Sequence, residues 1–280
     1  MDPDLVNLKT AKVRSIVVAF LCLVLLSFAF AQIAPAPVVQ RQVQGQTLIS
    51  RELPAAQFTF SKDYRYVGGQ VIVLYGNAEA EQHLFVRGAD TGPIQSFYWI
   101  QFEHFLPTNK MTYDYKPERV VDIGGLPFIY DVKSFLDYAY MQNEDPRSDG
   151  AAMSRLLAEH KVAFPKKVAR VRMFYLPTPD HRTELMIIYG EVLQEDSKVP
   201  LNTSRDVGVL LDDAAPEAAK DIRDRAIRSM GIRNLQRPQI MSPETDKRSR
   251  PLASTIPWNR FNSLAHAFGG EPKALQNRSR

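Results

Sequence analysis

The chain has 280 residues, 45% of them hydrophobic, a single cysteine and a formal net charge of +4. The positive charge is concentrated at the end of the chain, because residues 236–280 hold eight Lys or Arg and three Asp or Glu. The remaining chain is therefore close to neutral. Nucleic-acid-binding domains usually carry basic patches on the folded body, so the composition argues against that class and we expect no nucleic-acid partner.

The N-terminal region predicts export. Three cations precede an uncharged apolar run, Ser15–Ala31, which ends in the small-x-small pattern Ala29-Phe30-Ala31. Signal peptidases accept this pattern, so we expect residues 1–31 to be a signal peptide cleaved between Ala31 and Gln32. The run has 17 residues, near the lower limit for crossing a bilayer, and the alternative is an uncleaved single-span membrane anchor.

The only cysteine, Cys22, lies inside this apolar run. The cleaved chain would have no disulfide and would depend on its own hydrophobic core for stability. This combination favours a bacterial periplasm or cell surface over eukaryotic secretion. Contact with the membrane would be transient, through the signal peptide, unless that segment stays uncleaved.

Three regions follow the predicted signal peptide. Residues 32–56 are rich in Pro, Ala and Gln and lack a strand or helix period, which predicts a flexible linker. Residues 57–235 have the length of one domain with a substantial core. Residues 236–280 are rich in Pro, Ser and Arg, which predicts a basic and mostly disordered tail.

Strand patterns dominate the predicted domain. Runs of β-branched and aromatic residues are separated by short segments rich in turn-forming residues, and connections this short favour antiparallel pairing. The predicted strands are Val71–Tyr75, Glu79–Arg87, Ile94–Leu106, Arg119–Ile123, Pro127–Val132, Lys167–Leu176 and Arg182–Leu193.

Two helices interrupt this pattern. Ser148 is a favourable N-cap for a helix that ends before Pro165, and a second helix begins near Pro216 and closes at Gly231 as its C-cap. The order of elements predicts an α+β domain. We expect a mostly antiparallel, curved β-sheet with two or three helices packed on one face or end.

The predicted strand Ile94–Leu106 carries aromatic residues on both faces. Its more continuously apolar face should point to the core, and we expect the strand Glu79–Arg87 to add a histidine and a phenylalanine to the other face. Aromatic walls with a few polar groups are typical of ligand pockets; the alternative is ordinary packing under a helix or loop. The candidate ligand-binding residues are His83, Phe85, Phe97, Trp99, Gln101 and Glu103.

A second candidate lies on the predicted strand Lys167–Leu176. Arg170 and Arg172 share one face of it with Phe174. The two arginines would suit an anionic group, and the alternative is that they protect an exposed sheet edge.

Familiar catalytic motifs do not occur. The sequence has no nucleotide-binding glycine fingerprint, no G-x-S-x-G and no H-E-x-x-H. Five dispersed histidines and no cysteine after cleavage leave no local set of metal ligands, so we expect no metal and no cofactor.

Three functional hypotheses follow. The leading one is a non-catalytic exported protein that binds a small molecule or another envelope component. The alternative is an exported hydrolase or lyase with a dispersed active site near His83 and Glu103, the pair on this surface suited to proton exchange near neutral pH. The third is a structural protein whose terminal segments contact the cell envelope.

Overall fold

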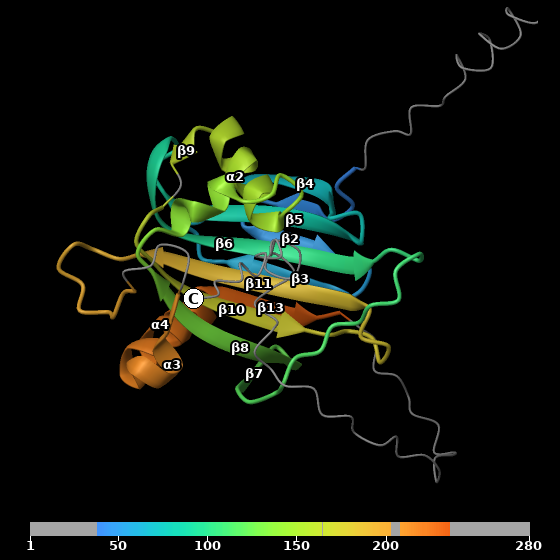
Figure 1. The fold of residues 1–280 in the computed structure, drawn as a ribbon. Coiled ribbons are helices and arrows are strands. Elements are labelled where there is room, and N and C mark those ends of the chain that lie inside the picture. The colour runs from blue at the N-terminus through green and yellow to red at the C-terminus, as the bar shows by residue number, and fades with distance from the viewer. Residues whose placement is uncertain (1–37, 164, 203–207, 236–280) are drawn as a thin grey trace, which may run out of the picture. The chain divides into compact units, whose positions relative to one another are not determined.

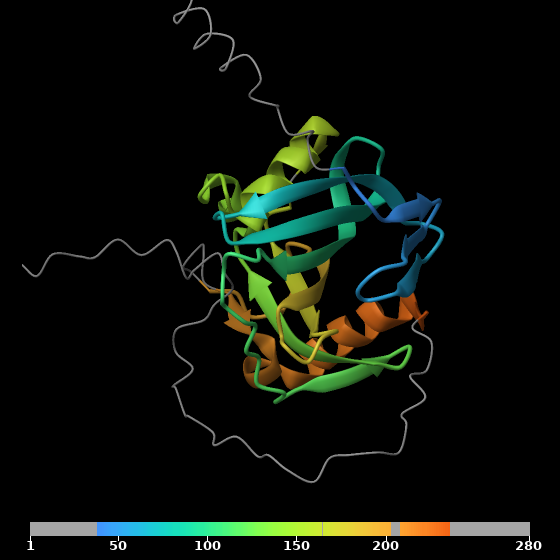
Figure 2. The ribbon, with the colours of Figure 1, turned by 90° about the vertical axis from the view of Figure 1, so that its right-hand side faces the viewer.

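The computed structural model describes residues 38–163, 165–202 and 208–235. The predicted signal peptide, its cleavage site at Ala31 and Gln32, and the predicted tail 236–280 lie outside the described residues. The described part is an α+β domain of two β-sheets and four short helices, which confirms the predicted class (Figure 1). The larger sheet is strongly curved (Figure 2).

The larger sheet has nine strands within the described ranges, antiparallel except where β9 pairs with β6. The predicted antiparallel pairing of neighbouring strands is confirmed, since β5 pairs with β6, β7 with β8 and β10 with β11. In spatial order the main path runs through β12 (Val209–Leu210), β8 (Leu126–Phe135), β10 (Val168–Tyr175), β11 (Thr183–Val192), β6 (Gly92–Phe105), β5 (Ala78–Gly88) and β4 (Arg65–Leu74), with β7 (Val120–Ile123) beside β8 and β9 (Val162–Ala163) beside β6.

The smaller sheet joins the start and the end of the described chain. Its order is β1 (Gln42–Gln44), β2 (Thr47–Ser50), β3 (Ala56–Phe60) and β13 (Met230–Asn234). Two of these strands fall inside the range 32–56, so the predicted flexible linker is wrong over these residues. Strands of three or four residues are too short to show a period, and their role follows from their pairing and from the burial of Leu48 and Ser50.

The helices are η1 (Tyr138–Asn143), α2 (Asp149–Glu159), α3 (Leu211–Ala214) and α4 (Pro216–Arg228). The predicted N-cap of α2 is confirmed, because the Ser148 side chain accepts a hydrogen bond from the Ala151 N–H at 3.0 Å. The predicted C-cap of α4 is wrong: Ser229 ends the helix and Gly231 belongs to β13, where its N–H and C=O serve the pairing with β3.

Both faces of the larger sheet are covered. One face packs against the smaller sheet and α4, through side chains such as Tyr98, Ile100 and Phe58. The other face packs against α2 and η1, through Trp99 and Leu156 among others (Figure 1). This second face is apolar beneath α2 and becomes polar beyond it, and the polar part holds the candidate site.

Candidate functional site

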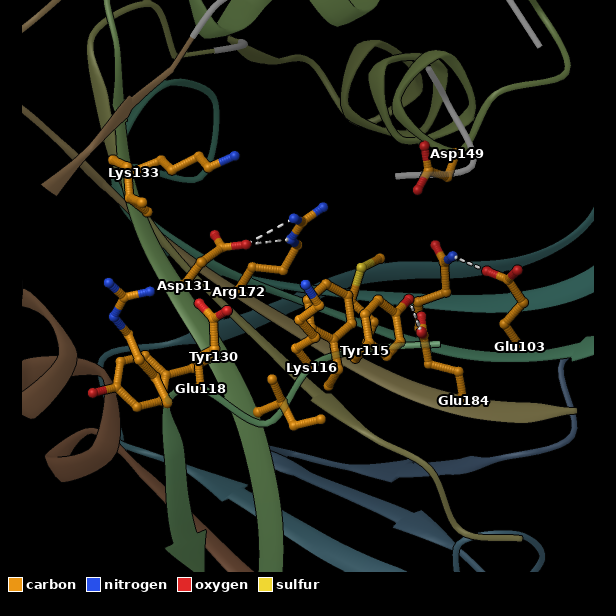
Figure 3. Close-up of a pocket in the computed structure, with 16 residues that line it drawn as sticks. Glu103, Tyr115, Lys116, Glu118, Tyr130, Asp131, Lys133, Asp149, Arg172 and Glu184 are labelled. Carbon is orange, nitrogen blue, oxygen red and sulfur yellow. Dashed lines mark hydrogen bonds and ion pairs between the residues drawn. The ribbon is translucent and has the colours of Figure 1, made fainter. Parts of the chain in front are cut away.

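A cavity of about 270 Å³ lies on the polar part of this second face. Side chains of β6, β8, β10 and β11 form its floor, and the connection 106–119, the first turn of α2 and β12 supply its rim (Figure 3). Nine of its sixteen lining residues have acidic or basic side chains. The volume is close to that of small-molecule sites, and the lining favours a polar occupant.

Two buried carboxyl groups meet at one end of the cavity. Glu103 of β6 and Glu184 of β11 are direct partners in the antiparallel ladder, and such partners have Cβ atoms about 5 Å apart. They are 4% and 3% exposed. Burial raises the pKa of Glu103 to about 7, and burial together with the charge of Glu103 raises the pKa of Glu184 to about 8. The pair therefore retains protons near neutral pH.

Two tyrosines from the connection 106–119 hold these carboxyls. The Tyr113 hydroxyl donates to Glu103 Oε1 at 2.6 Å, and the Tyr115 hydroxyl donates to Glu184 Oε2. The connection is thus fixed to the sheet at two points, although it forms no regular element. Burial, with the neighbouring carboxylates, keeps the pKa of both hydroxyls above the ordinary value, so they act as donors.

A chain of glutamine side chains crosses three strands to reach Glu103. Gln70 Nε2 donates to Gln82 Oε1 at 2.7 Å, Gln82 Nε2 to Gln101 Oε1 at 2.8 Å, and Gln101 Nε2 to Glu103 Oε2 at 2.7 Å. Gln70 Nε2 also donates to the carbonyl of Ala152 in α2 at 2.9 Å. Each amide fixes the orientation of the next, so the chain presets the position of the Glu103 carboxyl.

The opposite end of the cavity is basic. Arg172 donates to Asp131 Oδ2 from Nη2 at 2.7 Å and from Nε at 3.2 Å, and Arg170 Nη2 lies 3.5 Å from Asp131 Oδ1. Burial would raise the pKa of Asp131, but the charges of the two arginines and Lys133 outweigh it and hold that pKa at about 2. The Asp131 carboxylate is therefore close to three basic side chains, those of Arg170, Arg172 and Lys133.

Several lining residues have polar atoms without a hydrogen-bond partner among the described residues. They include Glu184, through Oε1, Arg172, through Nη1, and Lys133, through Nζ. Figure 3 shows Tyr115 between Arg172 and Glu184, and Asp149 of α2 on the far side of the cavity from the sheet. The cavity thus offers a carboxyl oxygen at its acidic end and donors at its basic end.

An aromatic wall connects the two ends. The ring of Tyr115 stacks on Phe174, with centroids 4.3 Å apart and an interplanar angle of 16°. The guanidinium carbon of Arg172 lies 4.7 Å from the centroid of the same Phe174 ring. This packing sets the positions of Tyr115 and Arg172 before any ligand arrives.

The six residues predicted to form one surface divide between the two faces of the larger sheet. The four from β6 share a face as predicted, but His83 and Phe85 of β5 point to the other face, because the register pairs Leu84 with Trp99. The expected register is therefore wrong. Every residue from Ala80 to Val86 is buried, so no alternation of polar and apolar residues indicates the direction of each side chain.

Two of the four β6 residues pack in the core, and the other two line the cavity. Phe97 and Trp99 belong to the apolar cluster with α2 and η1, in line with the packing alternative. Gln101 and Glu103 line the cavity.

His83 belongs to a separate buried ionic cluster. Its Nε2 lies 2.8 Å from Glu81 Oε1, and its Nδ1 lies 3.1 Å from the Tyr66 hydroxyl. Glu81 also binds Arg41, through the main-chain N–H at 2.9 Å and Nη1 at 2.7 Å. The predicted proton exchange between His83 and Glu103 is excluded by their position on opposite faces of the sheet.

The structure tests one of the two interpretations given for Arg170 and Arg172, that they protect an exposed sheet edge. Strand β10 lies between β8 and β11, so the interpretation as a protected edge is wrong. Of the two arginines, Arg172 is in the cavity lining and Arg170 is not, and the interpretation as a group for anions stays a prediction. Asp131 and Glu184 were not predicted as site residues, and their signal was an acidic residue next to a run of apolar residues in each strand.

In the described ranges, no three His, Cys, Asp or Glu side chains cluster so as to hold a metal ion. None of the helices within those ranges has the length and apolar character needed to cross a membrane. No family model, no curated protein and no solved structure matches this chain, so its function is argued from its own residues.

Proposed function

We propose that this chain is an exported, non-catalytic binding protein whose cavity between Glu184 and Arg172 holds a small polar molecule. One observation carries the proposal: a small cavity in which acidic and basic side chains keep polar atoms without partners in the described chain. These atoms are open to the cavity and are not among the fully buried side-chain atoms that lack a partner. A ligand that supplies partners for them would gain hydrogen bonds to charged groups, each of which contributes about 1.5–3 kcal/mol.

Export is supported by the sequence. The apolar run Ser15–Ala31 and its ending Ala29-Phe30-Ala31 have the features of a cleaved signal peptide. The protein would then act in the periplasm or at the cell surface. Its ligand would be a small solute, or a group of another envelope component that fits a volume of about 270 Å³.

A second candidate function is an exported hydrolase or lyase, with Glu103 and Glu184 in place of the originally expected pair. Adjacent carboxyls whose pKa values lie at about 7 and about 8 can provide an acid and a base near neutral pH. Binding is preferred, because no Ser, Thr, Cys or His occurs among the described residues that line the cavity. Both carboxyls also already accept hydrogen bonds from tyrosines.

The test is thermal unfolding of the protein with a panel of amino acids, dipeptides, neutral sugars, uronic acids, dicarboxylates and polyamines. The variant is Glu184→Gln, and the matched control is Glu195→Gln, at a carboxylate that is 89% exposed. We expect at least one class to raise the Tm of the wild type and of the control by about 5–10 °C at a hundredfold excess over Kd. Glu184→Gln should lose most of this rise.

Two outcomes would overturn the proposal. One is a panel without effect on the wild type, or with equal effect on Glu184→Gln. The other is consumption of the solute, followed by NMR, that is lost in Glu184→Gln, because it would replace binding with catalysis.

A further inference from the structure

The two ends of the cavity carry opposite charge, and we infer that its ligand is a zwitterion whose cationic amine and anionic group are separated by several bonds. This inference rests on the proposed binding function and specifies the chemical class of the ligand. A basic amino acid, an ω-amino acid and a short peptide belong to this class.

The acidic end is suited to an ammonium group. Glu184 is 97% buried, and its Oε1 accepts no hydrogen bond within the described residues, while Oε2 is held by Tyr115. Glu103 lies beside it and Asp149 faces it from α2 (Figure 3). An ammonium group placed here would meet three carboxyl groups. Its positive charge would favour the ionised form of Glu184, which would release its proton to solvent and accept a hydrogen bond from the ammonium group.

The basic end is suited to a carboxylate or a similar anion. Arg172 uses Nε and Nη2 on Asp131, which leaves Nη1 available, and Lys133 Nζ makes no hydrogen bond within the described part of the chain. Asp131 balances one of the three nearby cations, and Glu118 also lines this end of the cavity (Figure 3). An anionic group bound by Arg172 and Lys133 would compensate the charge that Asp131 does not.

The register of the strands sets the spacing between the ends. Arg172 pairs with Ile188, which is four residues along β11 from Glu184. At about 3.3 Å per residue the two backbone positions are about 13 Å apart along the strand. The side chains bring the charged groups closer than this, because the charge of Arg172 acts to lower the pKa of Glu184 against the rise caused by burial. Tyr115 lies between them (Figure 3), so a ligand that reaches both needs its ammonium and carboxylate several bonds apart, whereas in an α-amino acid they share one carbon atom.

The middle of the cavity suits an uncharged stem. Met186 lies on β11 between Glu184 and Ile188, the partner of Arg172, and Phe174 pairs with Met186 and stacks on Tyr115. Alternative charge patterns fit worse, because a dicarboxylate would place an anion beside Glu184 and a diamine would place a cation beside Arg172.

The test uses four probes in calorimetric titrations of the full chain. 6-Aminohexanoate has both charges and a flexible stem, hexanoate lacks the amine, hexylamine lacks the carboxylate, and glycine has both charges on one carbon. We expect 6-aminohexanoate to bind at least tenfold more tightly than each other probe, which corresponds to about 1.4 kcal/mol.

Two variants test which end of the cavity binds the ammonium group and which binds the carboxylate. Glu184→Gln should reduce the preference for 6-aminohexanoate over hexanoate, and Arg172→Gln should reduce its preference over hexylamine. Glu195→Gln and Arg147→Gln, at side chains that are 89% and 63% exposed, are the matched controls and should leave both preferences unchanged. Circular dichroism of each variant confirms that the fold is intact.

The inference is overturned if 6-aminohexanoate binds no more tightly than the one-ended probes, or if Glu184→Gln and Arg172→Gln leave its affinity unchanged. The binding function survives such a result when another class of the first panel binds in a manner that depends on Glu184. If neither set of compounds binds up to about 10 mM, which corresponds to a few kcal/mol, both the inference and the proposed function fail.

Discussion

Replacement of Glu184 by Gln should flatten the dependence of folding stability on pH. The pKa of Glu184 is raised to about 8 and that of Glu103 to about 7 in the folded protein, against a usual value of 4.5. Between these limits the folded state holds protons that the unfolded state has lost. Stability rises with pH only where the unfolded state binds more protons. The contribution of this pair is therefore complete below about pH 4.5 and is lost as the pH rises to about 8.

The size of the effect follows from linkage. A carboxyl that is protonated when folded and ionised when unfolded changes the free energy of unfolding by about −1.4 kcal/mol per pH unit. Glu184→Gln removes one such group while its amide oxygen still accepts from Tyr115. The slope between about pH 5 and 7 should become less negative by up to about 1.4 kcal/mol per pH unit. Glu144 and Asp149 also have raised pKa values, so part of the slope should remain.

The assay is urea unfolding, followed by circular dichroism, at several pH values from 5 to 8. Above pH 8 the variant should be more stable than the wild type, because it has no carboxyl that must ionise in a buried site. Glu195→Gln should reproduce the wild-type slope. If Glu184→Gln has that slope too, the carboxyl is not held protonated in the folded protein and the description of the pair is wrong.

Three further predictions concern the rest of the chain. Arg41→Met should lower the free energy of unfolding by about 3–5 kcal/mol in urea titrations, because it leaves Glu81 buried without its cation; Arg147→Met, at an exposed pair, should have little effect. Ser148→Ala should cost about 1 kcal/mol in the same assay through loss of the N-cap of α2, and Ser148→Asp should retain most of the stability. Mass spectrometry of the exported protein should find Gln32 at its N-terminus, and recovery of intact Met1 on soluble cytosolic material would contradict export.

Local sequence patterns were sufficient for much of the larger sheet. The β5–β6, β7–β8 and β10–β11 hairpins are each joined by short turns, so their pairing follows from neighbouring residues. The smaller sheet could not be predicted in this way. Its last strand, β13, pairs with β3, so that Met230, near the end of the described chain, lies opposite Phe60, near its beginning. Such pairings depend on the whole fold, and strands of three to five residues give no period of their own.

In the candidate site, too, some residues could be predicted from the local sequence and others only from the pairing of distant strands. Gln101 and Glu103 were selected because a strand with aromatic residues on both faces is unusual. Glu184 could not be selected, because its importance comes from lying directly opposite Glu103 in the β6–β11 ladder. Asp131 is in the same position relative to Arg172, and a charged residue in an apolar strand acquires a meaning only when its neighbour across the sheet is known.

The arrangement of charges in the cavity is difficult to explain by stability alone. Burial of a carboxyl pair opposes folding, and well-packed apolar residues in such positions are often more stable. The cavity also contains Arg172, which could form an ion pair with Glu184 and hold it ionised at neutral pH. The fold instead directs Arg172 to Asp131 and gives Glu184 a tyrosine hydroxyl, and Tyr115 lies between the two side chains (Figure 3). A core selected only for stability would pair Arg172 with Glu184, whereas a site that binds both ends of a zwitterion must keep them apart.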